Sequence, residues 1–306
     1  MRCATPGVLS GRRFPTPGAG DPARIMDTLS AMSQTGQRPG PLAVGVDLGG
    51  TWLRLVALRD GQVLRRTRRS IPVSELSKFL PALLGRRAPI ASLVVAARGV
   101  WTPAERRAAA RRLGRAAARV HVISDAEAAL LGAHDGRPGL LVLAGTGSIV
   151  LGRDARGRLA RAGGLGPLLG DEGSAFWLGR EWLRLTPAAG TRARALGRRP
   201  DAVARVAALA PRVLARARGG DRRARAIVAA GQARRAALAA DVIRRLRLRR
   251  PVSVSWGGSL LANAAYRAGV RRALARHAAC RWQAPALDAA LAAARLAARG
   301  VTRSRG

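Results

Sequence analysis

Three short glycine turns, each directly after a hydrophobic run, most constrain what this chain can fold into. They are Gly49-Gly50-Thr51, Gly145-Thr146-Gly147 (with Ser148 next) and Gly257-Gly258-Ser259. Glycine has no Cβ, so the backbone N–H groups of such turns can approach a bound group closely. One turn alone would be an ordinary hairpin. Three of them, with carboxylates in nearby loops, predict a nucleotide whose phosphates are held by backbone amides.

Two other phosphate-binding motifs are excluded. The sequence contains no G-x-x-x-x-G-K-[ST] motif, and its single lysine, Lys78, is far from any glycine turn. A Rossmann fingerprint is also absent. We therefore expect Mg²⁺ and arginine, together with backbone amides, to neutralise the phosphates.

The order of the expected elements indicates an α/β protein with two related domains and a cleft between them. A three-stranded hairpin followed by strand, helix, strand and helix occurs twice in outline. We expect strands at 42–48, 52–58, 62–68, 92–97, 120–123, 140–144, 148–153, 158–161 and 251–255, and helices at 74–84, 102–119, 124–134, 171–185, from 260 onward and at 286–299, with two or three more within 198–248.

These elements divide the chain into regions. Domain I is expected at 41–135, joined by the last helix at 286–300, and domain II at 136–285. Residues 1–40 are rich in proline and glycine with little periodicity, which predicts a disordered tail and makes Met26 or Met32 an alternative start.

Two helix starts carry capping boxes, at Thr102–Glu105 and Ser124–Glu127. The second follows a strand directly, so Asp125 is expected at the strand end where ligands gather in an open sheet. Asp125 is then either an acid favoured by the helix dipole or a general base that takes a proton from a substrate hydroxyl. Glu127 is expected to be only the capping partner.

Two further aspartates stand in glycine-rich contexts. Asp47 precedes the first turn and is either a turn cap or a ligand that holds Mg²⁺ through water. Asp171 precedes a predicted helix and is either a plain N-cap or a ligand for sugar hydroxyls.

The amino-acid composition bears on whether the partner is a nucleic acid or a membrane. The net charge is +38, and all but one of the 55 basic residues are arginines. Alanine, arginine, glycine and proline share GC-rich codons, so a GC-rich genome explains much of this charge. A specific nucleic-acid partner is not expected, because the arginines are spread over most predicted helices and only 3% of residues are aromatic. Two cysteines and no long apolar segment favour a cytoplasmic protein without a membrane span.

The motifs together resemble a known family. Val46–Thr51 and Ala144–Ser148 resemble the two phosphate motifs of the sugar kinase, actin and heat-shock chaperone ATPase superfamily, and Trp256–Ser259 resembles its adenosine motif. The string Gly163–Trp177, which contains Gly-Asp-Glu-Gly-Ser, is similar to the BadF/BadG/BcrA/BcrD ATPase family, in its N-acetylglucosamine kinase branch.

The resemblance implies two ribonuclease-H-like domains with ATP and Mg²⁺ and a sugar in the cleft. It implies that Asp125 is the base and that a sugar hydroxyl is phosphorylated. It also implies that the last helix packs on domain I, and it leaves a homodimer open. The phosphates and adenosine would contact Asp47, Gly49, Gly50, Thr51, Gly145, Thr146, Gly147, Ser148, Gly257, Gly258 and Ser259, and the sugar would contact Gly164, Leu165, Gly166 and Asp171.

Three departures from the family pattern concern the sugar. Ile149 stands where an asparagine is usual, Leu165 where a tryptophan is usual, and the region 69–92 is short. Each change removes polar contacts, and such contacts are what allow a site to reject wrong substrates.

Three alternative functions stay open. They are an ATPase that is not a sugar kinase (an iron–sulfur activator or an inactive relative), a repressor-type sugar kinase, and a nucleic-acid binder. Cys3 and Cys280 are poorly placed for the activator, and the zinc motif of the repressor type is absent.

Overall fold

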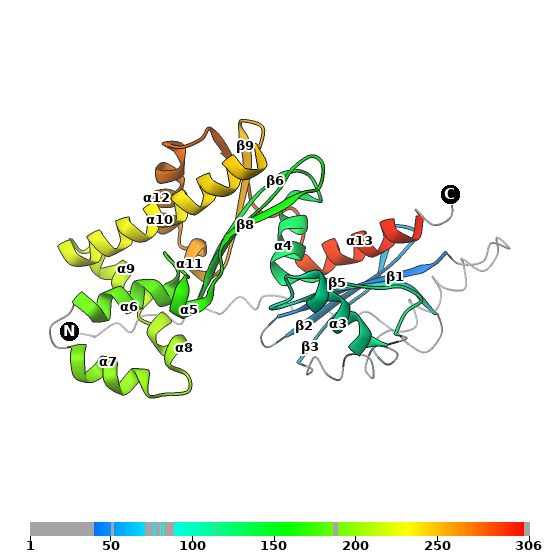
Figure 1. The fold of residues 1–306 in the computed structure, drawn as a ribbon, viewed down its shortest axis with the longest axis horizontal. Coiled ribbons are helices and arrows are strands. Elements are labelled where there is room, and N and C mark those ends of the chain that lie inside the picture. Colours follow the sequence, from blue (N-terminus) through cyan, green and yellow to red (C-terminus); the bar gives the residue numbers. More distant parts are fainter. Residues whose placement is uncertain are drawn as a thin grey trace, which may run out of the picture. The chain divides into compact units, whose positions relative to one another are not determined.

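The computed structural model describes residues 40–49, 52–70, 76, 80, 82, 89–114, 116–185 and 189–302 (Figure 1). The tail expected at 1–40, apart from Gly40, lies outside these residues. So do Gly50, Thr51 and most of the helix expected at 74–84.

The first sheet has the strand order β3-β2-β1-β4-β5. Strands β1, β4 and β5 run parallel, and β2 and β3 form an antiparallel hairpin on one side. The hairpin turn Asp60-Gly61 has φ values of 49° and 79°, as a type I′ turn requires. The strands are β1 (Leu42–Leu48), β2 (Leu53–Arg59), β3 (Gln62–Arg69), β4 (Ile90–Ala97) and β5 (Val120–Ser124).

The second sheet repeats this order and these directions. Read as β8-β7-β6-β9-β10, it has two antiparallel pairs followed by two parallel pairs, as the first sheet has. The repeat confirms the expected α/β fold with two related sheets. The strands are β6 (Gly139–Ala144), β7 (Ser148–Arg153), β8 (Leu159–Gly163), β9 (Val252–Gly257) and β10 (Cys280–Trp282).

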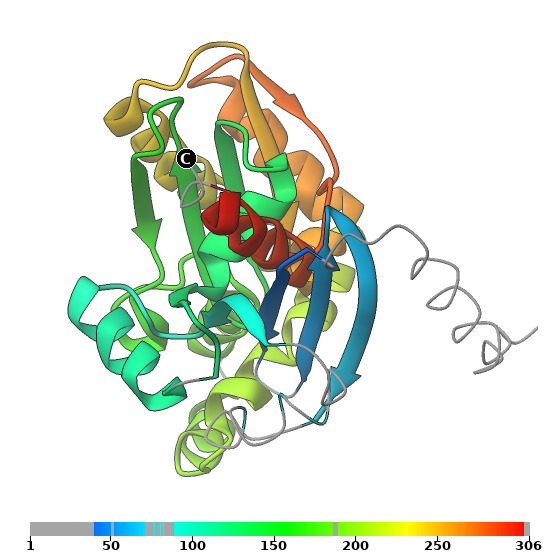
Figure 2. The same ribbon diagram turned by 90° about the vertical axis from the view of Figure 1, so that its right-hand side faces the viewer.

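Strand β1 is buried along its whole length because both of its faces are covered. The last helix, α13 (Ala289–Thr302), packs on one face, as Figure 2 shows. The approach is close: a Cβ on Gly45 would overlap the backbone of Ala290 and Ala294. Alanines on α13 and the glycine on β1 therefore allow the helix backbone to lie against the strand. On the other face, Leu76 and Leu80 join the apolar cluster.

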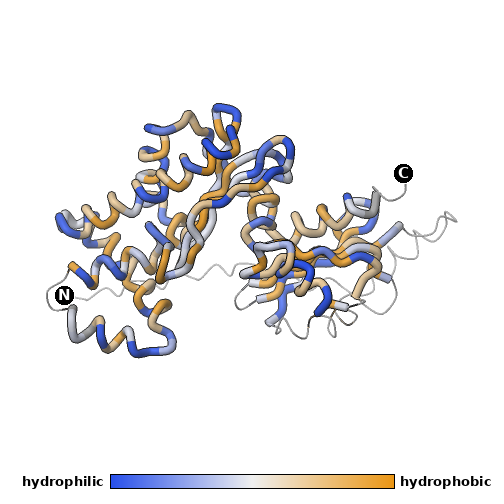
Figure 3. The backbone as a smooth tube through the Cα atoms, in the orientation of Figure 1, coloured by the Kyte–Doolittle hydropathy of each residue, from blue (hydrophilic) through white to orange (hydrophobic). Residues whose placement is uncertain are grey.

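Helix α4 (Asp125–His134) follows β5 and packs against β6 and β7. Its Ala126, Leu130 and Ala133 form one apolar cluster with Leu141 and Leu151. Figure 3 shows hydrophobic and hydrophilic residues alternating along the helices and strands. Because the first residue of α4 is Asp125, the packing of this helix fixes where that carboxylate lies.

The remaining helices lie mainly around the second sheet. The long helix α10 packs on β6, β7 and β8 and is flanked by α9 and α12. These helices are α3 (Pro103–Leu113), α5 (Gly166–Leu169), α6 (Ala175–Leu185), α7 (Ala189–Gly197), α8 (Ala202–Ala207), α9 (Ala210–Arg218), α10 (Arg222–Leu246), α11 (Ser259–Ala262) and α12 (Ala264–Ala275). Within the described part of the chain, none of the helices is both long and apolar enough to cross a bilayer.

Several expected boundaries were wrong. Helix α3 ends at Leu113 rather than near Arg119, because Gly114 adopts a φ of 57° and stops it. The helix expected from residue 260 is divided at Asn263, whose side chain caps α12. The short elements β10, α5 and α7 were not predicted. The capping box at Thr102–Glu105 is confirmed, with both reciprocal hydrogen bonds present.

Candidate functional site

The second glycine turn is held rigidly by the loop that precedes α6. Within the turn, the N–H of Gly145 donates to the carbonyl of Gly147 at 2.9 Å. The first N–H groups of α6, from Ala175 and Phe176, donate to the carbonyls of Gly145 and Thr146 at 2.8 and 3.1 Å. Because the carbonyls of the turn are engaged from the α6 side, its backbone geometry is fixed before any ligand binds.

Asp171 lies directly against this turn. Its carboxylate accepts a 2.9 Å hydrogen bond from the N–H of Ser148. The residue as a whole is only 6% exposed. A Cβ on Gly147 would meet both carboxylate oxygens at 3.0 Å. Asp171 itself has a left-handed φ of 61°, a conformation that aspartate tolerates better than most residues. Asp171 is thus an anchor of the turn and not the plain N-cap of α6.

A buried cation lies behind this loop and was not singled out by the sequence. Arg235 on α10 is fully buried, and its Nη1 donates to the Ser148 hydroxyl at 2.8 Å and to the carbonyl of Glu172 at 3.3 Å. Burial lowers the pKa of Arg235 to about 10, and the negative charges of Glu172 and Asp171 oppose that shift. Its Nε and Nη2 find no partner among the described residues.

Tyr266 completes the support of the loop. Its hydroxyl donates to the carbonyl of Gly173 at 2.8 Å, and burial raises the pKa of this phenol. Gly173 has a φ of 66°, and a Cβ there would overlap the carbonyl of Gly231 and approach Arg235. The only signal in the sequence for these supports was the glycine-dense loop itself, since Arg235 is one of many arginines in an alanine-rich helix.

The third glycine turn meets the second. Gly258 has a φ of 90°, and a Cβ there would overlap the carbonyl of Ala144 at the end of β6. The Ser259 hydroxyl lies 3.6 Å from the position a Cβ on Gly145 would take. Strands β6 and β9 are parallel neighbours, so their carboxyl ends bring both turns together, as expected for motifs at one edge of an open sheet.

A cavity of about 430 Å³ opens beside these two turns. Thr146 from the second turn and Ser259 from the third line one part of it. Helices α8 and α9 line another part with alanines, Pro211 and Leu214. The volume and the mostly apolar wall with a few polar groups are typical of a site for a small organic molecule.

Asp47 lies at the carboxyl end of β1, beside the first turn. Its Oδ2 accepts a 3.1 Å hydrogen bond from Arg54 Nη1. Burial raises the pKa of Asp47; Arg54 acts in the opposite direction, and the charges of Asp125 and Asp288 add to the rise. In the turn, the N–H of Gly49 donates to the Trp52 carbonyl at 3.0 Å. The other two residues of this turn lie outside the described structure.

Asp125 is the first residue of α4, as expected, and its side chain is 31% exposed. Its Oδ1 accepts from the N–H of Ala126 at 2.8 Å, and Arg98 Nε lies 3.9 Å from Oδ2. The expected capping box is only half formed. Ser124 accepts from the N–H of Glu127, but the Glu127 carboxylate pairs with Arg106 at 2.8 Å instead of capping the helix.

The predicted residues form two groups. Asp47 and Asp125 lie at the carboxyl ends of β1 and β5, with β4 between these strands. The second and third turns and Asp171 gather at the carboxyl ends of β6 and β9. No hydrogen bond or ion pair links the two groups within the described residues.

The segment expected to contact the sugar, Gly164–Gly166, has apolar side chains around it. Leu165 is 62% exposed, and a Cβ on Gly164 would overlap the side chain of Ile149.

Comparisons with known proteins agree with this geometry. The N-acetylmuramic acid/N-acetylglucosamine kinase of Clostridium acetobutylicum is 49% identical over 61 residues, a match that covers 20% of this chain and only 20% of that kinase. A candidate N-acetylglucosamine kinase from Chromobacterium violaceum has a similar structure, with a TM-score of 0.60 and 26% identity over 84% of this chain and 99% of that one.

The fold extends to other sugar kinases. A ROK family glucokinase from Streptomyces griseus, solved with glucose and AMPPNP, superposes with a TM-score of 0.52 and 19% identity, over 85% of this chain and 100% of that one. The two repeated sheets are therefore those of the actin-like ATPase fold. The model of the BadF/BadG/BcrA/BcrD ATPase family matches residues 44–297. With the motifs that the structure brings together, this match shows that the chain belongs to the BadF/BadG/BcrA/BcrD ATPase family.

Proposed function

We propose that this protein is an ATP-dependent kinase that phosphorylates a hydroxyl group of a sugar or amino sugar. The observation that carries the proposal is the meeting of the second and third glycine turns at the wall of one cavity of about 430 Å³. The likeness to N-acetylglucosamine kinases supports the substrate class. The repeated sheet order supports a division into domain I (41–135 with the last helix) and domain II (136–285).

The residues present fit ATP. The alanines of α8 and α9 offer a flat apolar wall for an adenine ring. Gly145 and Gly147 carry no Cβ, although Asp171 packs against Gly147. The N–H groups of Gly145 and Ser148 are already bound, so phosphate oxygens would approach those of Thr146 and Gly147. Catalysis would then consist mainly of positioning and electrostatic stabilisation, as is usual in phosphoryl transfer.

Mg²⁺ is proposed to lie beside Asp47, at the end of β1. This ion usually keeps several waters and needs only one or two carboxylates beside the phosphates. Asp47 would hold the ion through water, because Arg54 engages only its Oδ2. The ion would supply positive charge to the phosphate oxygens.

Asp125 is proposed as the general base. Its Oδ1 is fixed by the N–H of Ala126, and its Oδ2 lies 3.9 Å from the largely exposed Arg98, so the carboxylate is oriented while its side chain stays 31% exposed. It would accept the proton of the substrate hydroxyl as that oxygen attacks the terminal phosphoryl group. General base catalysis of this kind contributes roughly 10²–10⁴ in rate.

The sugar is proposed to lie against Asp171 and Gly164–Gly166. Asp171 has one oxygen held by Ser148, which orients its carboxylate toward the turn. The apolar Ile149 and Leu165 supply no hydrogen bonds to hydroxyl groups, and fewer polar contacts weaken discrimination between sugars. We therefore propose an N-acetylglucosamine-type substrate, with tolerance for related sugars.

The test is an ADP-release assay over N-acetylglucosamine, N-acetylmuramic acid, glucose and other hexoses. We expect sugar-dependent turnover that falls by about 10²-fold or more in Asp125→Asn. The matched control is Asp135→Asn, the same chemical change at the other end of α4. Asp135 has a φ of 51°, which asparagine tolerates, and among the described residues its side chain forms only an exposed ion pair, with Arg295.

Two results would count against the proposal. Equal turnover of Asp125→Asn and the wild type would remove Asp125 as the base. ATP binding without turnover on any sugar would contradict the kinase function and favour an ATPase without a sugar substrate.

A further inference from the structure

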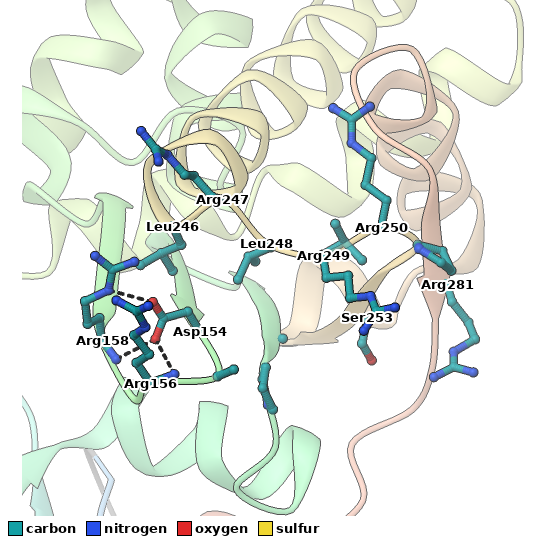
Figure 4. A pocket seen from close by; sticks show the side chains of 15 residues that line it. Asp154, Arg156, Arg158, Leu246, Arg247, Leu248, Arg249, Arg250, Ser253 and Arg281 are labelled. Carbon is teal, nitrogen blue, oxygen red and sulfur yellow. Dashed lines mark hydrogen bonds and ion pairs between the residues drawn. The ribbon is translucent and has the colours of Figure 1, made fainter.

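A second cavity, of about 790 Å³, lies in the same half of the chain, and arginine is the commonest residue in its lining (Figure 4). Six of its fifteen described lining residues are arginines, and Asp154 is the one carboxylate among them. This is well above the share of arginine in a chain with 55 basic residues among 306. The arginines are Arg156, Arg158, Arg247, Arg249, Arg250 and Arg281.

Most of these cations lack an acidic partner within the described ranges. The single carboxylate, Asp154, is already bound by Arg158 at 2.6 Å and by the backbone N–H groups of residues 156 and 158. The side chains of Arg156, Arg249 and Arg281 have no hydrogen bond or ion pair to any described residue. Elsewhere on the surface many arginines do pair with acids, as Arg205 does with Asp201 at 2.7 Å. The cavity therefore gathers uncompensated positive charge.

The cations come from segments far apart in the sequence. Figure 4 shows Arg156 and Arg158 beside Asp154 on the β7–β8 hairpin, and Arg249 and Arg281 on the opposite side, near Ser253. Figure 3 shows the hairpin tip and the segment after α10 in hydrophilic colours. The cations stand around the rim of a concave space, so a ligand there would meet positive charge from more than one segment of the chain. A flat charged surface would not provide this.

The cavity is separate from the nucleotide site. Strands β6 and β9 begin at Gly139 and Val252, which line the arginine cavity. The same strands end at Ala144 and Gly257, beside the second and third glycine turns. At ~3.3 Å per residue, the two ends of these strands are roughly 15–20 Å apart.

We propose that this cavity binds a small anion that carries several linked phosphate groups. Guanidinium groups suit phosphate because their planar donors form paired hydrogen bonds to its oxygens. The volume suits one small molecule. None of the described residues that line the cavity is aromatic, so bases would have no platform on which to stack, and recognition would rest on the phosphates themselves. These observations favour a small polyphosphate over a nucleic acid.

The test is a calorimetric titration with inorganic tripolyphosphate at about 0.15 M salt, where diffuse surface charge is largely screened. The full-length protein is first given one equivalent of AMPPNP with Mg²⁺, which fills the nucleotide site and leaves no excess triphosphate to occupy the arginine cavity. We expect about one equivalent to bind. The affinity should fall by about tenfold or more in the double variant Arg249→Ala/Arg281→Ala, which loses two charge-assisted contacts. Arg156→Ala, on the other side of the cavity, should weaken binding independently.

The matched control is Arg271→Ala/Arg272→Ala, which removes two exposed arginines from α12, outside the cavity. Unchanged affinity in the control supports the proposal. Equal losses in the control and cavity variants would mean diffuse charge attraction and would overturn it, as would the absence of binding to the wild type. A parallel titration with a short DNA duplex completes the test. Tighter binding of the duplex, lost in the same cavity variants, would overturn the small-anion proposal in favour of nucleic acid.

Discussion

The guanidinium of Arg235 donates a 2.8 Å hydrogen bond to the hydroxyl of Ser148, from a position with no exposure to solvent. The pair links α10 to the second glycine turn. The Ser148 hydroxyl in turn donates to the Glu172 carbonyl at 3.1 Å. One buried cation thus joins the turn proposed to hold phosphate to the loop that carries Asp171.

Replacing Arg235 with Met should weaken ATP binding more than it weakens the fold. Methionine fills most of the space without a charge, and exchanging a buried charge for a well-packed apolar group is often nearly neutral for stability. We expect an affinity for ATP about tenfold lower, measured by calorimetry, and a similar melting temperature.

Coupling between the two residues can be measured directly. In a double-mutant cycle with Ser148→Ala, the losses in ATP affinity should be non-additive by about 0.5–3 kcal/mol, because the two side chains share one hydrogen bond. Additive losses would show that Arg235 does not act through Ser148.

Gly147→Ala should disrupt the same turn from the other side. The new Cβ would meet both oxygens of Asp171 at 3.0 Å, and the carboxylate cannot move without losing its bond to the N–H of Ser148. Overpacking of this kind costs about 1–3 kcal/mol of unfolding free energy, and KM for ATP should rise. Denaturant unfolding and steady-state kinetics measure the two effects.

The control for this substitution is Gly190→Ala on α7, where a Cβ would meet no atom within 4 Å. Alanine in a helix should leave stability unchanged or raise it by up to about 1 kcal/mol. If both variants behaved alike, the close packing of Asp171 on the turn would have no energetic consequence.

Asp47→Asn should separate stability from activity. Burial raises the folded-state pKa of Asp47 above 3.8, so the folded state binds more protons than the unfolded state as pH rises from that value. The ionised carboxylate therefore opposes folding at neutral pH. We expect the substitution to leave stability at pH 7 unchanged or higher, with no gain near pH 3.

Activity should respond in the opposite direction. Because Asp47 is proposed to hold Mg²⁺ through water, turnover should fall by about 10–100-fold and recover partly at high Mg²⁺. Melting curves at pH 7 and pH 3 measure the effect on stability, and turnover measured over a range of Mg²⁺ concentrations measures the effect on activity. Unchanged magnesium dependence would contradict the assigned role.

His134 should make stability depend on pH near neutrality. Burial lowers its pKa below the usual 6.5, and its Nε2 lies 3.0 Å from the Leu140 carbonyl. The unfolded state then binds more protons than the folded state below pH 6.5, so stability present above that pH is lost as pH falls toward the folded pKa. In His134→Gln, the melting temperature should vary less between pH 7 and 5. An equal slope in the wild type and the variant would exclude His134 as the cause.

The sequence predicted those parts of the site that depend on residue type. Gly258 packs against the Ala144 carbonyl with a φ of 90°, a conformation for which glycine is the ordinary choice. Asp125 was identifiable because a helix start follows a strand directly. The contacts that the second glycine turn makes with residues distant in the sequence could not be predicted, because they depend on how α6 and α10 pack.

Arg235 shows the limit most clearly. Helix α10 contains many arginines, and nothing in their local sequence distinguishes the buried one from those in solvent. The same holds for β10, which has three residues, too short to show a period of two. The supports of the turn were therefore missed because the one buried arginine of α10 has a local sequence like that of its many exposed neighbours.

The packing of α13 on β1 has a consequence for synthesis on the ribosome. The strands of the first sheet precede the whole second sheet in the chain, but the alanine-rich helix that covers one of their faces follows it. Until then, β1 and its neighbours expose an apolar face, and such surfaces promote aggregation in unfinished chains. The first sheet can therefore complete its core only after α13 has been made, and chains that stop before Ala289 should be insoluble.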